Sequence, residues 1–230
     1  MRYLNKIVFI NSAAIRYSEV QLDGNIHLIG TQGVGKSTIL RAILFFYNAD
    51  TQRLGIPVEK KSYQDYYFPY ADSSIIYEVA REDGWFTVLS YKTMNRICYR
   101  FIASPYRPDL FIDEEGAPYP SDRIRSVLDK NGIKYSGAIS TYEEYRNILY
   151  GNSDNKRDYS CYSLMESGSY QNIIRTIQNV LLNSRLEADY IKQTIITSLN
   201  EADSVIDLSR YRSHLSGFAV GIEETFGACS

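Results

Sequence analysis

Residues 30–37 have the composition and spacing of a loop that binds phosphate groups. The segment reads Gly30, Thr31, Gln32, Gly33, Val34, Gly35, Lys36 and Ser37, which matches the G-x-x-x-x-G-K-[ST] pattern at every fixed position. Glycines let successive backbone N–H groups turn inward around an anion, and Lys36 brings a mobile positive charge to the β- and γ-phosphates. Ser37 is expected to ligate magnesium through its hydroxyl, and Thr38 to contact the α-phosphate. These residues predict a site for a nucleoside triphosphate.

The segments on both sides of this loop have the character that a phosphate loop requires. Residues 25–29 are apolar enough to form a strand that leads into Gly30. Residues 37–47 carry apolar side chains at helical spacing: Ile39, Leu40, Ile43, Leu44 and Tyr47. The helix would present the positive end of its dipole to the phosphates.

The rest of the chain predicts a sheet followed by helices. Strands are expected at 3–10 and 15–22, joined by a polar turn at Asn11 and Ser12, and a long loop at 50–72. An antiparallel meander is expected at 74–80, 85–92 and 96–103. Helices are predicted at 121–131, at 140–151 with a capping box at Ser140, and over 170–199. We therefore predict an α/β phosphate-loop NTPase fold with an antiparallel meander and a helical second half.

A second acidic motif leaves an alternative open. Residues 110–114 read Leu, Phe, Ile, Asp113, Glu114, an apolar run followed by two carboxylates that could bind magnesium and activate water. The run is short, and Gly116 and Pro118 follow it as in a hairpin turn. The hairpin is the preferred interpretation. In the alternative, the chain is a self-contained small NTPase or kinase, and Asp113→Asn would abolish turnover.

Composition excludes several other classes of site. Three separate cysteines and two histidines, His27 and His214, do not support a disulfide framework, a zinc site or a Ser–His nucleophile. The net charge of −2 does not favour a strongly basic nucleic-acid module. No apolar run reaches the roughly 18 residues of a membrane span, and no signal peptide is visible, so a cytoplasmic location is expected. The 21 tyrosines, including the cluster at 63–70, are interpreted as packing residues.

A resemblance to a known family rests on these same segments. The block Lys-Ile-Val-Phe-Ile-Asn at 6–11, a second strand, and a third strand leading to residues 30–37 resemble the N-terminal half of SMC-like ATPase heads. The charged segment at 209–212 resembles the exit of such a head toward its coiled coil. The likeness is greatest to the bacterial branch that includes MukB and the large subunit of Wadjet-type plasmid defence.

The resemblance implies a site divided between two lobes. It implies ATP and Mg²⁺ as ligands, a glutamine, here Gln64, that contacts magnesium and the attacking water, and nucleotide contacts from Asn11 and Ser12. It also implies partners: a C-terminal lobe of the same protein, a second head in a homodimer, DNA, and accessory subunits. ATP binding would join the heads, and hydrolysis would follow only in the complete dimer.

Several family motifs are not found in these residues. There is no signature motif, no convincing Walker B strand, no switch histidine and no long heptad repeat. The chain is therefore expected to be a fragment that binds nucleotide weakly and hydrolyses it poorly. Residues 1–105 would form the nucleotide-binding lobe with the meander, and 106–230 a mixed, largely helical subdomain leading toward a coiled coil. A non-catalytic interaction module that nucleotide merely stabilises is a further alternative.

Overall fold

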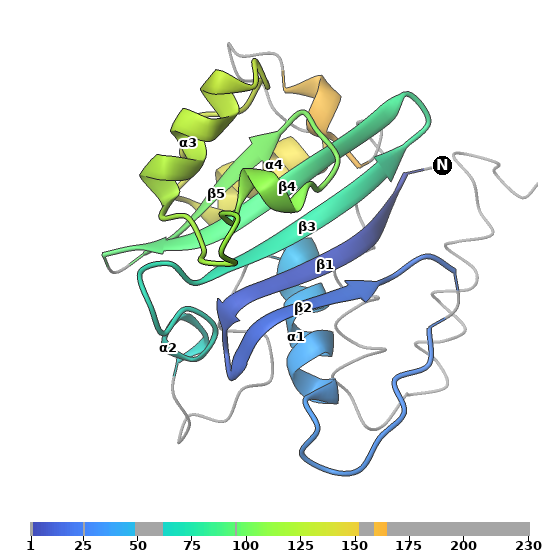
Figure 1. Ribbon diagram of the computed structural model, residues 1–230. Helices are drawn as coiled ribbons and strands as arrows, with labels where there is room; N and C mark the ends of the chain where they lie inside the picture. The colour runs from blue at the N-terminus through green and yellow to red at the C-terminus, as the bar shows by residue number, and fades with distance from the viewer. Residues whose placement is uncertain (1, 25, 49–61, 95, 152–158, 165–230) are drawn as a thin grey trace, which may run out of the picture. The chain divides into compact units, whose positions relative to one another are not determined.

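The chain is built around one antiparallel sheet in this computed structural model (Figure 1). The structure describes residues 2–24, 26–48, 62–94, 96–151 and 159–164. The strand order is β2-β1-β3-β4-β5, and every neighbouring pair is antiparallel. The strands are β1 (Tyr3–Ser12), β2 (Ile15–Gln21), β3 (Ser74–Arg81), β4 (Gly84–Thr93) and β5 (Arg96–Ile102). The meander predicted for 74–103 is confirmed, and the helices described below confirm the α/β class.

Alternation along the strands gives the sheet two buried faces. In β1, Ile7 and Phe9 join one apolar cluster, whereas Val8 and Ile10 join the other. Successive side chains of a strand point to opposite faces, so this period of two requires cover on both sides. A sheet that is buried on both faces is stabilised by apolar burial worth roughly 1.5–3 kcal/mol for each fully buried large side chain.

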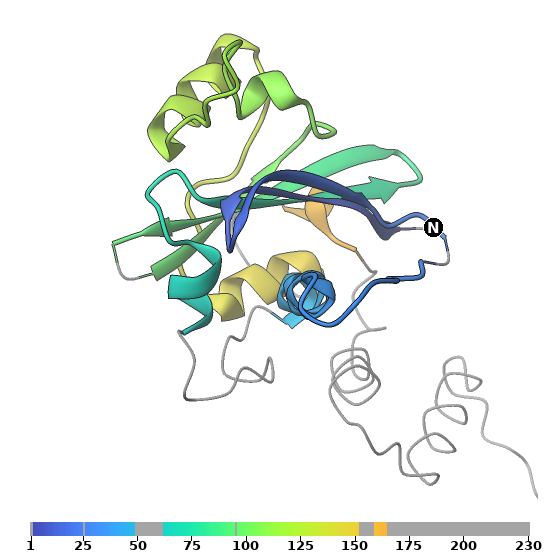
Figure 2. The same ribbon diagram turned by 60° about the horizontal axis from the view of Figure 1, so that its bottom comes forward.

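Helices cover each face (Figure 2). The first face carries α1 (Lys36–Asn48), α2 (Tyr63–Tyr67) and α4 (Tyr142–Leu149). The second face carries α3 (Ser121–Lys130) and the short 3-10 helix η2 (Pro108–Leu110). A second 3-10 helix, η3 (Ser160–Tyr162), adds Tyr162 to the core of the first face. The phosphate-loop motif, which precedes α1, is therefore attached to the first face.

The predicted helices following the motif and in the second half are confirmed within the described residues. Helix α3 ends at Asn131 and Gly132, as expected. The cap of α4 lies one residue later than predicted, because Thr141 and not Ser140 accepts the hydrogen bond from the Glu144 N–H. The helical prediction for 170–199 lies outside the described residues, and the division between residues 105 and 106 stays a prediction.

Three local predictions are wrong. The turn between β1 and β2 lies at Ala13 and Ala14, because Ser12 still pairs with Ile15. The expected loop at 50–72 contains α2, with Ser62 as its N-cap. The strand expected at 25–29 is not formed at residues 26–29, which have no regular structure. Ile26 is 41% exposed and Ile29 is 90% exposed, so among the described residues no neighbouring strand covers this segment.

Candidate functional site

Residues 30–35 form a largely exposed loop that leads into α1 and that requires glycine at particular positions. Gly33 and Gly35 have φ values of +91° and +92°, a region that side chains with a Cβ rarely enter. At Gly30, an added Cβ would come 2.7 Å from the Val34 side chain. The turn thus requires glycine at positions 33 and 35, and the nearby Val34 side chain favours it at position 30.

The side chain of Lys36 lies over this loop. Its ammonium donates hydrogen bonds to the carbonyl oxygens of Gly30 and Thr31, the latter at 2.7 Å. The loop therefore curves around a positive charge that neutral carbonyls hold in place. An anion arriving at the loop would meet this ammonium without first displacing a carboxylate.

The start of α1 adds a second source of positive potential. The first N–H groups of a helix have no partner within the helix, and the helix dipole concentrates positive charge there. The first turn of α1 contains no acidic residue that would neutralise this charge. Ser37 is exposed and Thr38 is buried, so Ser37 is open to a ligand from the solvent side. Loop, ammonium and helix N-terminus together can receive a phosphate chain.

Helix α2 is bonded directly to this first turn. The Tyr66 and Thr38 hydroxyl oxygens lie 3.2 Å apart, and the Tyr67 hydroxyl donates to the Thr38 carbonyl at 2.8 Å. Gln64 lies on the same short helix and is half-buried. The structure therefore brings the helix that carries Gln64 to the helix that carries the phosphate loop. Whether Gln64 contacts magnesium stays a prediction.

Asn11 and Ser12 lie at the end of β1, next to the segment that follows α2. Asn11 donates from its amide to Asp72 at 2.8 Å, and its carbonyl accepts a hydrogen bond from the Ser73 hydroxyl at 2.6 Å. Asn11 adopts a positive φ of 44°. Ser12 is fully buried, and its hydroxyl has no partner among the described residues. Asn11 therefore stabilises the turn through these hydrogen bonds, and Ser12 does not reach solvent. Contact of either residue with nucleotide stays a prediction.

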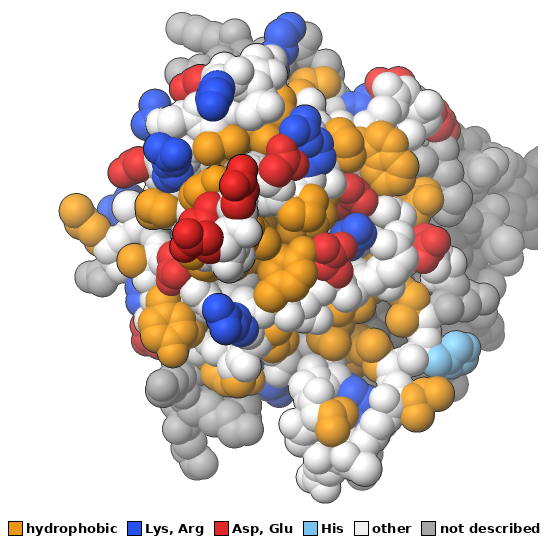
Figure 3. Space-filling view, viewed as in Figure 1, with side chains coloured by type: hydrophobic (Ala, Val, Ile, Leu, Met, Phe, Trp, Pro, Cys, Tyr) orange, Lys and Arg blue, Asp and Glu red, His pale blue; other side chains and the backbone are white. Residues whose placement is uncertain are grey.

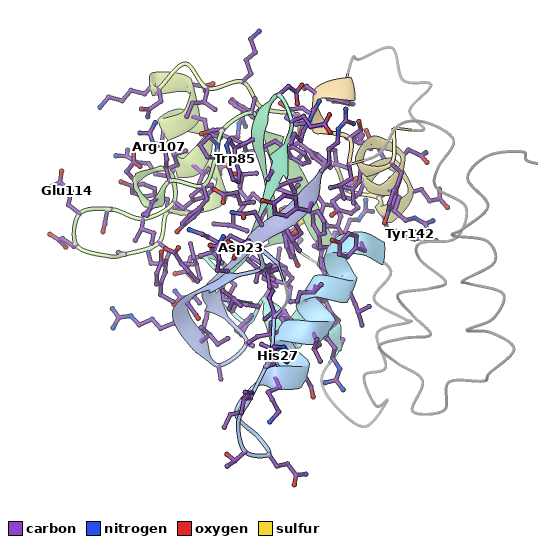
Figure 4. The ribbon with its side chains drawn as sticks, turned by 90° about the vertical axis from the view of Figure 1, so that its right-hand side faces the viewer. Asp23, His27, Trp85, Arg107, Glu114 and Tyr142 are labelled. Atoms are coloured by element: carbon purple, nitrogen blue, oxygen red, sulfur yellow. The ribbon has the colours of Figure 1, made fainter. Side chains whose placement is uncertain are left out.

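Asp113 and Glu114 lie apart from the phosphate loop. Asp113 accepts hydrogen bonds from the N–H groups of Glu115 and Ala117, and Ile112 pairs with Pro118 across the turn. This confirms the hairpin interpretation. Glu114 lies at the tip of this hairpin on the α3 side of the sheet, whereas His27 lies near the start of α1 (Figure 4). A groove of about 830 Å³ between the hairpin and α3 includes no residue of the phosphate loop.

Sequence reasoning missed the role of Tyr66 and Tyr67. The signal was present: Ser62 and Asp65 have the spacing of a helix cap, and Tyr63 and Tyr67 recur at one helical turn. Ser62 does cap α2, accepting from the Asp65 N–H at 3.2 Å. Five residues are too few for a periodic pattern to stand out within a long polar segment. The expectation that these tyrosines pack is confirmed for Tyr63 and Tyr67, which are buried.

The described part of the chain was searched for metal-binding clusters and for membrane-spanning helices. No group of three or more His, Cys, Asp or Glu side chains gathers there to hold a metal ion. None of its helices is long and apolar enough to cross a bilayer.

Comparison with known proteins gives a family assignment. A search of curated proteins found no significant match. A family model described as "Protein of unknown function (DUF3584)" matches residues 12–216, which is most of the chain and includes the phosphate loop, α1 and α2. The chain therefore belongs to the DUF3584 family.

Proposed function

We propose that this chain binds ATP with Mg²⁺ as the N-terminal lobe of an SMC-like ATPase head. One observation carries the proposal: residues 30–37 curve around the Lys36 ammonium at the start of a helix whose first turn contains no acidic residue. Each part attracts a polyphosphate, and the three coincide at one place. The preference for ATP over other nucleotides rests on the family resemblance.

The residues present fit the proposed ligands. The positive φ values of Gly33 and Gly35 give the loop the kind of turned backbone that can direct N–H groups toward phosphate oxygens. Lys36 would bind the β- and γ-phosphates and Ser37 would ligate magnesium, with Gln64 approaching from α2. When bound, ATP supplies the phosphoryl group for transfer, and magnesium neutralises part of its charge.

The unpaired segment before the loop supports a divided head. Residues 26–29 expose Ile26 and Ile29 and pair with no strand among the described residues. An exposed apolar segment of this kind is suited to be covered by another structural element. We propose that the C-terminal lobe of the same protein covers it. A second head would then complete the ATP site in a homodimer, so that hydrolysis occurs only in the full assembly.

DNA is proposed as a ligand of that full assembly in the cytoplasm, with accessory subunits as further partners. The α3 face does not by itself favour DNA. Acidic and basic side chains are interspersed over this face (Figure 3), whereas nucleic-acid surfaces are dominated by positive charge. A contact with DNA is therefore expected elsewhere in the assembly.

The self-contained enzyme is the less favoured alternative. Its carboxylates would have to act at the γ-phosphate. Asp113, however, is engaged in capping its own turn, and the hairpin lies on the α3 side of the sheet. Nothing in this arrangement brings either carboxylate of the motif to Lys36.

Calorimetric titration of the 230-residue chain with Mg-ATP tests the proposal. Lys36→Ala should weaken binding about 10- to 100-fold, the usual loss for one charge-assisted hydrogen bond. Lys130→Ala, which removes an exposed lysine from the end of α3, is the matched control and should bind as the wild type does. Equal affinity of wild type and Lys36→Ala, or no binding by either, would refute the proposed site.

A further inference from the structure

We propose that Tyr66 is a positioning residue that links nucleotide at the phosphate loop to helix α2, which carries Gln64. This inference rests on the proposed function and extends it to a residue outside the motif. Its basis is the contact between the Tyr66 and Thr38 hydroxyls, 3.2 Å apart. Thr38 directly follows Ser37 in the first turn of α1.

The proton arrangement of this hydroxyl pair gives the contact its role. Each hydroxyl has one proton to donate and two lone pairs that accept. If the Thr38 proton goes to a phosphate oxygen, Thr38 accepts from Tyr66, and the two hydrogen bonds strengthen each other. Thr38 is only 9% exposed, so water has little access as a replacement donor. The Tyr66 hydroxyl therefore favours the orientation of Thr38 that suits a bound phosphate.

Tyr66 can act in this way because α2 is held on both sides. Asp65 pairs with Lys92 of β4 at 3.0 Å. Tyr63 stacks on Phe45 of α1, with ring centroids 4.5 Å apart. Because α2 is held in this way, the Tyr66 phenol reaches Thr38 from a fixed backbone, and the hydroxyl contact connects the Thr38 side chain to the helix that carries Gln64. A change in the orientation of the Thr38 hydroxyl on nucleotide binding would accordingly affect Tyr66 and the helix on which Gln64 lies two residues earlier.

Tyr67 provides an internal comparison. Its hydroxyl donates to the backbone carbonyl of Thr38 and is buried. A backbone carbonyl of α1 keeps its place with or without ligand, so this bond should stabilise the fold in both states. Tyr66, which is 39% exposed and touches a side chain, should matter mainly when nucleotide is bound.

A double-mutant cycle on Mg-ATP affinity tests the inference, with Tyr66→Phe, Thr38→Val and the double variant measured by calorimetry. Tyr66→Phe should weaken binding about three- to tenfold. The double variant should bind no worse than Thr38→Val, because the two hydroxyls act as one unit. Thr38→Ser keeps the hydroxyl, so in that background Tyr66→Phe should again weaken binding. The melting temperature of Tyr66→Phe without nucleotide should stay within about 2 °C of wild type.

The outcomes separate this inference from the proposed function. Wild-type affinity in Tyr66→Phe, or losses of affinity that multiply in the double variant, would overturn the inference. Weak binding by Lys36→Ala in the same experiments would leave the proposed function standing. If Tyr66→Phe lowers the melting temperature without nucleotide as much as Tyr67→Phe does, the residue is structural and the inference is wrong. If Lys36→Ala binds as tightly as wild type, the proposed function itself fails.

Discussion

Helix α1 and the loop that leads into it are adjacent in sequence but are held in opposite ways. Four buried tyrosine hydroxyls donate to backbone carbonyls of the helix at 2.6–3.0 Å: Tyr67 to Thr38, Tyr77 to Ala42, Tyr145 to Phe46 and Tyr150 to Tyr47. The loop is exposed, and its side-chain support is the Lys36 ammonium on two of its own carbonyls.

The difference separates placement from binding. The carbonyls of Thr38 and Ala42 have a second lone pair that is free for a phenol, whereas those of Phe46 and Tyr47 lie in the last turn of α1, where no N–H of the helix reaches them. The tyrosines therefore hold α1 without breaking its internal hydrogen bonds. They come from α2, β3, α4 and the residue after α4, so the helix is held from several directions. The loop is exposed to solvent, where a ligand can reach it. A rigidly placed helix that carries an open loop suits a site in which binding depends on orientation.

Alkaline pH should have the largest effect on stability, because it ionises the tyrosine hydroxyls that hold α1. Burial raises the pKa of Tyr67, Tyr77 and Tyr145 above the ordinary 10.0. The neutral phenol is favoured in the folded state, so stability is fully present below pH 10 and is lost as the pH rises above it. These three groups alone contribute a fall of about 4 kcal/mol in the free energy of unfolding per pH unit, and the other buried tyrosines whose pKa is raised, such as Tyr63 and Tyr99, add to it.

Urea unfolding at a series of pH values, followed together with tyrosinate absorbance, measures this slope. Tyr145→Phe removes one titrating phenol and should reduce the slope by about 1.4 kcal/mol per pH unit. Ionisation of the buried tyrosines near pH 10 with no loss of stability would contradict the account.

Removing a single tyrosine hydroxyl that holds α1 should have a smaller effect on stability. Tyr145→Phe removes a hydroxyl that is fully buried against α1. The free energy of unfolding should fall by about 0.5–1.5 kcal/mol. Tyr142→Phe is the control on the same helix, because Tyr142 is 46% exposed and keeps its ring contact with Arg146. Equal losses from the two variants would show that the bond to α1 contributes nothing specific.

A change in the loop should have the least effect on stability and a large one on binding. Gly33→Ala forces a side chain into a φ of +91°, a strain of about 1–2 kcal/mol that the exposed loop can relieve locally. Mg-ATP binding should be lost while the melting temperature changes by no more than about 2–4 °C. Gly116→Ala, at a φ of +81° in the hairpin on the other face, is the matched control and should bind normally. A large drop in melting temperature for Gly33→Ala would mean that the loop also supports the fold.

Local patterns predicted much of this structure. The meander turns at Asp83-Gly84 and Met94, the helix after the motif and the hairpin at Asp113 follow from turn chemistry and periodicity within a few residues. Local patterns could not show that residues 26–29 form no strand, because a strand is stable only beside a neighbouring strand. The turn at Ala13 has no turn residues, and its position depends on contacts of Asn11 with Asp72 and Ser73, about 60 residues away.

The sequence by itself determined the conformation of the loop at residues 30–37, since its glycines permit the turn and Lys36 supplies the charge within eight consecutive residues. Only the tertiary structure decided what surrounds it. It brought α2 and Tyr66 to Thr38, placed Asp113 on the α3 side of the sheet, and gave the numerous tyrosines a shared task along α1. A phenol reaches a helix carbonyl only after the sheet and helices have packed, and no spacing along the chain encodes that contact.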